Sequence, residues 1–361
     1  MQYKYLGNSN LKIPAIGQGC MGVGGYFSAD TSQDEHFIRM LRAGIEAGLT
    51  FLDTAEAYGA GHSEILVGQA IQGQRDKVVV ATKVSPEHLS YSDLLQAVEG
   101  SLRRLQTDYI DLYQVHWPNP RIPILDTMSA MARLVRERVV RHIGVSNFSV
   151  HNLQAAQAAL PEDKIQAVQV EYNLFDRTIE KDLLPYCEHE SITTIAYTPL
   201  DKGLLMTKDR RRDKLQELAE KYHKTPAQLI LKWLTSYPSV IAIPKATSLN
   251  HIIENAQAGD FDLSSSNFEE ISRLFDQPCV FILTDRIQVD SNGLDQFIPS
   301  PHDLAEAIRQ GEPLKPIRVI PAKDQRSSYD YVLIEGKLRY WAWVIAHEGK
   351  KPIPTLIRGD K

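Results

Sequence analysis

The sequence predicts an α/β fold, a (β/α)8 TIM barrel followed by a small α+β domain. Through residues 1–277 of the 361, short apolar runs alternate with helical patterns, which favours parallel pairing of the strands. Eight such runs are present, the number that closes a barrel. After residue 277 the alternation stops. We therefore expect two domains, 1–277 and 278–361.

The eight strands are expected where β-branched and other apolar residues gather in short runs. In chain order they span residues 15–19, 50–53, 78–83, 112–116, 142–145, 167–171, 194–197 and 240–244. Apolar residues at three- and four-residue spacing predict helices at 32–48, 90–105, 124–137 and 225–236. Ser90 or Ser92 can cap the start of the second helix, and Gly48 can end the first.

The composition is that of an ordinary globular protein. Hydrophobic residues make up 43% and charged residues 24%, and the net charge of -5 argues against a nucleic-acid partner. No run approaches the roughly 20 apolar residues that cross a bilayer, and the N-terminus lacks a signal-peptide pattern. We expect a cytoplasmic protein with no membrane partner. Three widely spaced cysteines indicate neither a disulfide framework nor a zinc site, and no metal is expected.

Four polar side chains at or just past predicted strand ends form the candidate catalytic set: Asp53, Tyr58, Lys83 and His116. Loops at this end of a parallel barrel carry the reacting groups. Lys83 should favour the phenolate of Tyr58 and lower its pKa, while Asp53 holds Lys83. With His116 as a second hydrogen-bond partner, the set suits proton donation to a carbonyl oxygen as hydride reaches the carbon. Alone, each also fits a structural role, as a helix cap, an interior ion pair or a core histidine; Tyr58, in a glycine-rich loop, fits one least.

Seven motifs occur in order along this region: DTAEAYGAGHSE, ATKVS, QVHWP, GVSNF, QVEYN, YTPL and IPKATSLNHIIEN. On these motifs, residues 1–277 resemble the aldo-keto reductase family. The resemblance implies a (β/α)8 barrel and a nicotinamide cofactor bound without a Rossmann domain. It also implies reduction of aldehydes or ketones to alcohols by hydride transfer, with Tyr58 as the proton donor.

The resemblance also assigns the contacts of the nicotinamide. Ser146, Asn147 and Gln169 would hydrogen-bond its carboxamide, and Tyr197 would stack on the ring. Thr198 and Leu200, in the same YTPL run as Tyr197, join the cofactor-binding set.

The adenosine end is assigned to the last motif. Lys245 would bind a 2'-phosphate, and Glu254 and Asn255 would face the adenine. The family commonly has an arginine six residues after this lysine, where His251 stands here. An imidazole lacks the permanent charge of a guanidinium and its planar set of N–H donors. Discrimination for NADPH over NADH should therefore weaken. NADPH remains the expected cofactor, with NADH as the alternative.

The substrate pocket should be walled by Tyr26, Phe27 and Trp117, and by residues after Leu200. These aromatic side chains suit a small apolar or aromatic carbonyl substrate. The basic run at 208–214 can be a solvated helix start or can attract an anion.

Residues 278–361 follow a different pattern, with short strands and a helix that begins after a glycine. They resemble the ParB-like fold that sulfiredoxins share, in which a G-x-x-R turn leads into a helix and binds nucleotide phosphates. Gly336 and Arg339 match that turn, and Lys337 replaces its usual glutamate. These three residues form a candidate phosphate site. The alternative is a module used for packing or dimerisation, so a homo-oligomer is one expected partner.

Two functional classes stay open. The first is an NADPH-dependent carbonyl reductase whose C-terminal domain serves regulation, assembly or nucleotide binding. The second is a sensor that binds the redox cofactor and signals through the ParB-like domain. The four candidate catalytic residues favour the reductase, because a binder needs only the cofactor contacts.

Overall fold

The computed structural model describes residues 1–160, 162–201, 203, 210–276, 278–290, 292, 299–311, 314–322 and 329–358. The chain divides into two compact units, Met1–Leu274 and Phe275–Lys361. The boundary predicted from the sequence falls after Gln277, a residue outside the described ranges.

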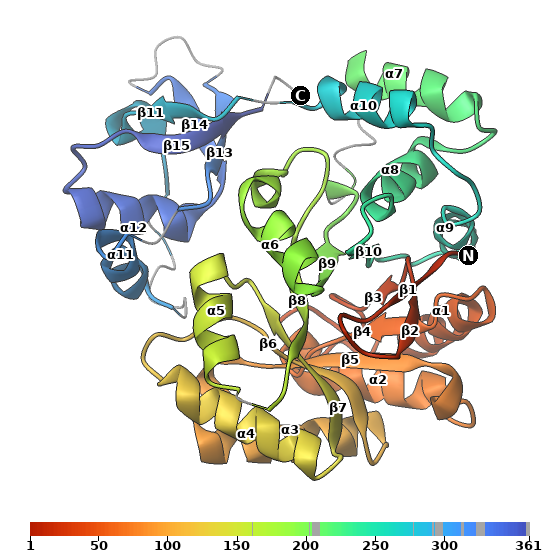
Figure 1. The fold of residues 1–361 in the computed structure, drawn as a ribbon. Coiled ribbons are helices and arrows are strands. Elements are labelled where there is room, and N and C mark those ends of the chain that lie inside the picture. Colours follow the sequence, from red (N-terminus) through yellow and green to blue (C-terminus); the bar gives the residue numbers. More distant parts are fainter. Residues whose placement is uncertain are drawn as a thin grey trace. The chain divides into compact units, whose positions relative to one another are not determined.

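The first unit is built around an eight-stranded parallel sheet in which each strand pairs with the next one along the chain (Figure 1). Its strands are β3 (Gln18–Gly19), β4 (Phe51–Asp53), β5 (Val79–Val84), β6 (Ile110–Val115), β7 (Val140–Ser146), β8 (Ile165–Glu171), β9 (Thr193–Tyr197) and β10 (Val240–Ala242). A parallel bridge between Ile16 and Ala242 brings the first segment against the last strand. The sheet is therefore a closed barrel, which confirms the predicted (β/α)8 fold.

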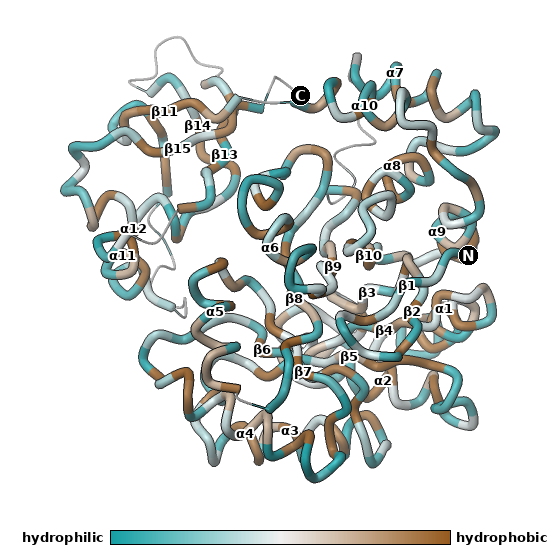
Figure 2. Tube along the Cα trace, viewed as in Figure 1, coloured by the Kyte–Doolittle hydropathy of each residue, from teal (hydrophilic) through white to brown (hydrophobic). Residues whose placement is uncertain are grey.

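Helices lie between and beyond these strands. They are α1 (Asp34–Glu46), α2 (His62–Ile71), α3 (Tyr91–Leu105), α4 (Ile124–Arg136), α5 (Val150–Ala158), α6 (Leu183–Glu190), α7 (Arg210–Glu220), α8 (Pro226–Thr235), α9 (Leu249–Gln257) and α10 (Ser265–Leu274). Hydrophobic and hydrophilic residues alternate along α3 and α4 in Figure 2, as expected for helices with one face on the barrel. Ser90 is the N-cap of α3, because its hydroxyl accepts from the Asp93 amide at 3.3 Å.

An antiparallel hairpin that was not predicted from the sequence precedes the barrel; its strands are β1 (Tyr3–Tyr5) and β2 (Lys12–Pro14). Each strand has only three residues, too few to show a two-residue period. Leu6 and Ile13 are fully buried and pack in the interior cluster with Phe51, the first residue of β4. The hairpin thus covers the end of the barrel opposite the catalytic candidates.

The second unit is a five-stranded mixed sheet with strand order β11-β15-β13-β14-β12. Its elements are β11 (Val280–Ile282), β12 (Ile287–Gln288), α11 (Pro301–Arg309), β13 (Ile317–Pro321), β14 (Tyr331–Glu335), α12 (Lys337–His347) and β15 (Ile353–Ile357). Ile317, Val319 and Ile353 form its core together with Tyr340 of α12. The layout is α+β, and α11 is a helix that was not predicted from the sequence. Within the described part of the chain, no helix is long and apolar enough to cross a membrane.

Candidate active site

The barrel interior changes from apolar to polar as the strands run toward their carboxyl ends. Phe51, Leu112 and Ala167 belong to the apolar interior cluster of β4, β6 and β8. Two residues further along the same strands, and so on the same inward face, stand Asp53, Gln114 and Gln169. Each of these three is at most 2% exposed. Polar side chains buried here must satisfy one another, since little water reaches them.

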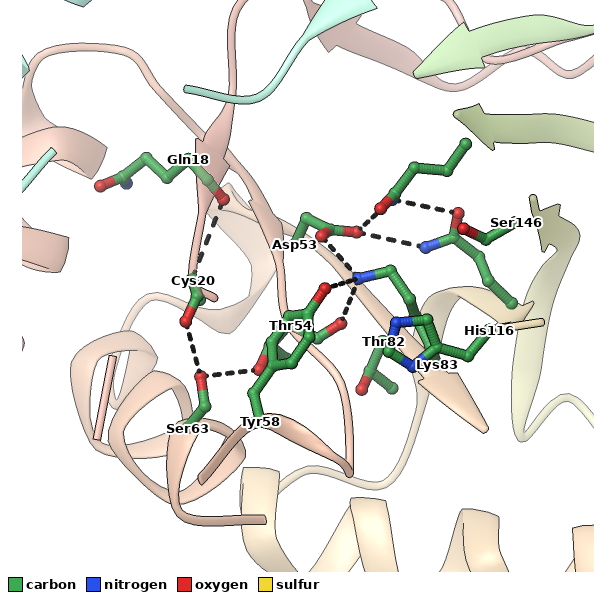
Figure 3. A network of polar contacts seen from close by, with 12 residues as sticks. Gln18, Cys20, Asp53, Thr54, Tyr58, Ser63, Thr82, Lys83, His116 and Ser146 are labelled. Carbon is green, nitrogen blue, oxygen red and sulfur yellow. Dashed lines mark hydrogen bonds and ion pairs between the residues drawn. The ribbon is translucent and has the colours of Figure 1, made fainter. Parts of the chain in front are cut away.

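Lys83 is the centre of this polar layer, and all three of its N–H donors are used. Its ammonium donates to Asp53 Oδ2 at 2.7 Å, to the Thr54 carbonyl at 2.9 Å and to Tyr58 Oη at 3.1 Å (Figure 3). The side chain is fully buried. Burial, the largest single influence, would lower the pKa of Lys83, but the Asp53 carboxylate and the Tyr58 oxygen together outweigh it and the net direction is upward. Lys83 therefore stays charged.

Tyr58 begins a short 3-10 turn, Tyr58–Gly61, in the loop after β4. Because an ammonium can only donate, Tyr58 Oη accepts from Lys83 and keeps its own proton for another partner. Burial raises the pKa of the Tyr58 phenol, and the nearby Lys83 charge does not reverse this. The expectation of a lowered pKa was therefore wrong: loss of water disfavours the phenolate more than one ammonium favours it. Tyr58 is a neutral phenol, which is the form that can donate a proton.

His116 follows the end of β6 and faces Tyr58. The two rings meet edge to face with their centroids 5.6 Å apart. Burial, together with the Lys83 charge, lowers the pKa of His116 to about 3. The imidazole is therefore neutral, and it makes no hydrogen bond to the part of the chain that the structure describes. Its ring nitrogens remain for a group that enters beside Tyr58.

The residues assigned to the nicotinamide lie on the next strands around the barrel. Ser146 ends β7 and pairs in register with Gln169 of β8. Asn147 has a left-handed backbone, φ 62°, and its amide donates to the His116 carbonyl at 3.0 Å. Tyr197, the last residue of β9, donates to Asn147 Oδ1 at 3.0 Å. Gln169 already donates to Asp53 Oδ1 at 2.6 Å, a contact that was not predicted from the sequence.

One of the four residues assigned to the adenosine end, Asn255, lines a small cavity between α1, α9 and the segment after β10. Asn255, 3% exposed, lines this cavity with Gly19 and Pro244. Glu254 instead accepts from the Thr225 hydroxyl at 2.5 Å. His251 is exposed on the first turn of α9. Lys245 is exposed too, with its ammonium 5.3 Å from the centre of the Tyr26 ring.

Aromatic side chains stand exposed at the same end of the barrel. Phe27 is 89% exposed, Tyr26 59% and Trp117 42%. The Tyr26 carbonyl accepts from the Gly59 amide at 2.8 Å, which joins this loop to the turn that holds Tyr58. Thr198 has a left-handed φ of 52° and its carbonyl accepts from Asn173, while the Leu200 carbonyl accepts from Gly203. Of the residues expected after Leu200 and in the basic run 208–214, residues 202 and 204–209 lie outside the described ranges.

Comparison with known proteins decides the family. Residues 15–276 match the aldo/keto reductase family. The chain belongs to this family. Methylglyoxal reductase YeaE of Escherichia coli is 36% identical over 280 residues, which cover 77% of this chain and 97% of that protein.

Solved structures agree with this assignment. The thermostable aldo-keto reductase Tm1743, solved with the inhibitor epalrestat, is 42% identical with a TM-score of 0.73 and covers 76% of this chain and 100% of its own. An aldo/keto reductase from Klebsiella pneumoniae, solved with NADP and acetate, is 39% identical with a TM-score of 0.70, covering 77% and 97% of the two chains. This aldo/keto reductase is therefore an oxidoreductase with a (β/α)8 fold. The family match ends at residue 276, before the second compact unit of the reductase begins its sheet.

Two sets of buried polar residues in this aldo/keto reductase were missed from the sequence. Gln114 lies in the polar layer beside Asp53, and Glu64 of α2, fully buried, accepts from Thr82 at 2.6 Å and from Arg104 at 2.6 Å. A signal was present, since Gln114 stands two residues before His116 in an apolar run and so shares its inward face. The helical pattern around Glu64 gives no sign of its partner, because Arg104 lies on another helix, α3.

The cations of the candidate phosphate site in the second unit have partners within the chain. Gly336, with φ 98°, lies between the last residue of β14 and the first residue of α12. Lys337 contacts the Asp290 carboxylate at 3.2 Å and the Asn292 carbonyl. Arg339 donates to the Pro316 carbonyl at 2.7 Å and pairs with Glu335 at 3.3 Å. A phosphate at this turn would have to compete with these contacts.

Proposed function

We propose that this aldo/keto reductase reduces aldehyde or ketone carbonyls to alcohols with NADPH, using Tyr58 as the proton donor. The observation that carries the proposal is the use of all three Lys83 donors, which leaves the Tyr58 proton unclaimed. The neutral His116 imidazole beside it can donate a second hydrogen bond to the carbonyl oxygen. Both donors act where negative charge develops as the carbonyl is reduced.

The residues around the barrel mouth fit a nicotinamide cofactor. Gln169 and Ser146 stand next to one another on β8 and β7, Tyr197 presents a half-buried ring, and the cavity by Asn255 lies on the adenosine side. When bound, NADPH supplies a hydride to the carbonyl carbon. Tyr58 gives its proton to the oxygen, so an alcohol leaves. Lys83 then faces a phenolate and holds it until a proton returns from water.

NADPH is preferred over NADH in this proposal because Lys245 can reach a 2'-phosphate. The relatives from Klebsiella solved with NADP and NADPH support the same choice. His251 contributes no permanent charge, so the preference is expected to be moderate.

The exposed aromatic side chains of Tyr26, Phe27 and Trp117 favour small or apolar carbonyl substrates. Methylglyoxal, named for the Escherichia coli relative, is a first substrate to test here. The proposal is tested by titrating the full chain with NADPH and with NADH, then following NADPH oxidation with methylglyoxal and a panel of aliphatic and aromatic aldehydes. Binding followed by turnover supports the reductase. Binding without turnover on any carbonyl would favour a protein that senses the cofactor.

We further propose that the second unit is a ParB-like module with a regulatory or assembly role. Its support is the β14–Gly336–α12 turn and the mixed five-stranded sheet around it. The pairing of Lys337 and Arg339 within the chain makes nucleotide binding the less favoured role. Calorimetric titration with ATP tests it, and micromolar binding would restore the nucleotide role. Sedimentation of the full chain tests assembly.

A further inference from the structure

Gln114 is the member of the polar layer to which the proposed reaction gives no task. It is fully buried on β6, between Asp53 and Gln169. Its Nε2 donates to Asp53 Oδ1 at 3.2 Å, and its Oε1 accepts from Gln169 Nε2 at 3.4 Å. Because the Asp53 carboxylate only accepts, it determines which end of the Gln114 amide faces it.

The barrel provides space for this side chain. On the adjacent strand β7, Gly144 is the partner of Gln114 in register. A Cβ at Gly144 would lie 2.9 Å from Gln114 Cγ, closer than such atoms approach. The glycine thus lets a long amide side chain lie inside the barrel where β4 and β8 face each other.

Gln114 and Asp53 together determine the orientation of Gln169. Both N–H bonds of Gln169 are directed into the protein, one to Asp53 at 2.6 Å and one to Gln114 at 3.4 Å. Its Oε1 has no hydrogen-bond partner in the part of the chain that the structure describes. The group that Gln169 presents to a ligand is therefore an acceptor.

We propose that Gln114 is a positioning residue that, together with Asp53, fixes the polarity of Gln169, so that the site selects an N–H donor on the carboxamide of the nicotinamide. The inference rests on the proposed cofactor. With its NH2 on Gln169, the carboxamide can turn only its oxygen toward the Ser146 hydroxyl, whose oxygen already accepts from Asn147 Nδ2 at 3.0 Å. The ring face that meets the substrate follows from this orientation. Without Gln114, one Gln169 N–H loses its acceptor, while the other stays on Asp53 at 2.6 Å.

The test compares two oxidised dinucleotides, NADP+ and its 3-acetylpyridine analogue, in which a methyl ketone replaces the carboxamide and the N–H donors are lost. Calorimetry gives the Kd of each for the wild-type chain and for Gln114→Leu. A hydrogen bond of ordinary strength predicts that the wild type binds NADP+ about tenfold more tightly than the analogue. Gln114→Leu should reduce this ratio to about twofold, because the Gln169 N–H that loses its Gln114 acceptor can then donate to the ketone.

The matched control is Gln166→Leu on β8, which removes a bond to the Asn8 amide at 2.8 Å and touches neither Asp53 nor Gln114. It should leave the ratio unchanged. If Gln114→Leu does not fold, Gln114→Met removes the amide from a side chain of similar length. A ratio that stays near tenfold in the variant, or is already near one in the wild type, would overturn the inference. A wild type that binds neither dinucleotide would overturn the proposed function instead.

Discussion

Each unit of the protein buries a cation against a carboxylate at the carboxyl end of a strand, and the two pairs are completed differently. In the barrel, Lys83 pairs with Asp53 at 2.7 Å and donates a further hydrogen bond to the Tyr58 hydroxyl. In the second unit, Arg318 of β13, 1% exposed, pairs with Glu335 of β14 at 2.6 Å. Arg339 from α12 reaches the same Glu335 carboxylate.

The difference lies in what the ion pair touches. Burying charge costs free energy that pairing only partly offsets, so a buried pair is weak support for stability alone. The Lys83 pair contacts a phenol whose proton is unused, next to a neutral imidazole. The Arg318 pair binds a second guanidinium and joins two strands to a helix. The first arrangement suits chemistry, and the second suits holding a fold together.

The largest effect is expected from removing the hydroxyl proton of Tyr58, the residue that the Lys83–Asp53 pair contacts. Tyr58→Phe should lower kcat for carbonyl reduction by about 10²- to 10⁴-fold, the range that general acid catalysis contributes. NADPH affinity should stay within a few-fold, because the ring remains. Stopped-flow reduction and fluorescence titration measure the two quantities. Tyr3→Phe, on the exposed hairpin, is the control; turnover retained in Tyr58→Phe would remove Tyr58 from the proton-donor role.

A second prediction concerns the ion pair between Arg318 and Glu335 in the second unit. Glu335→Gln leaves Arg318 buried without its carboxylate and should lower the free energy of unfolding of the second unit by about 1–3 kcal/mol. Carbonyl reduction per folded molecule should not change. Urea unfolding followed by tryptophan fluorescence reports the loss. Glu348→Gln, whose partner Lys350 is exposed, should cost nothing measurable. An equal effect of both variants would show that the Arg318 pair is not special.

A third change adds a permanent charge to the cofactor region. His251→Arg should tighten NADPH binding about tenfold, as expected for one charge-assisted hydrogen bond to a 2'-phosphate, and leave NADH binding unchanged. The two Kd values are obtained by titration. His151→Arg on α5 adds the same charge elsewhere. Equal tightening of both cofactors by His251→Arg would place this residue outside the phosphate site.

A fourth expected effect is a pH dependence of stability. The pKa of His116 falls from an ordinary 6.5 to about 3 on folding, so between these values the unfolded chain binds a proton that the folded chain does not. His116 therefore reduces stability as pH falls below 6.5, by up to about 1.4 kcal/mol per pH unit. Urea unfolding at pH 7 and pH 5 should show a smaller loss for His116→Asn than for the wild type. An identical loss would mean that the imidazole is already protonated in the fold.

Much of the barrel could be predicted because its signals are local. All eight barrel strands lie where apolar runs predicted them, since a strand buried on both faces must be apolar along its length. Asp53, Lys83 and His116 were recognisable because they interrupt or end such runs. The N-terminal hairpin and α11 were missed because they are short or lie in a region without a repeating pattern.

By itself, the sequence determined the order of the elements, the barrel and which polar residues stand at its strand ends, because periodicity and strand ends can be seen along the chain. The tertiary structure decided how these residues share protons. The upward pKa of Tyr58, the three acceptors around Lys83 and the amide of Gln114 between Asp53 and Gln169 depend on burial and on distances across the barrel. The contacting residues lie up to 116 positions apart in the chain, as Asp53 and Gln169 do. At such a separation no local sequence pattern carries information.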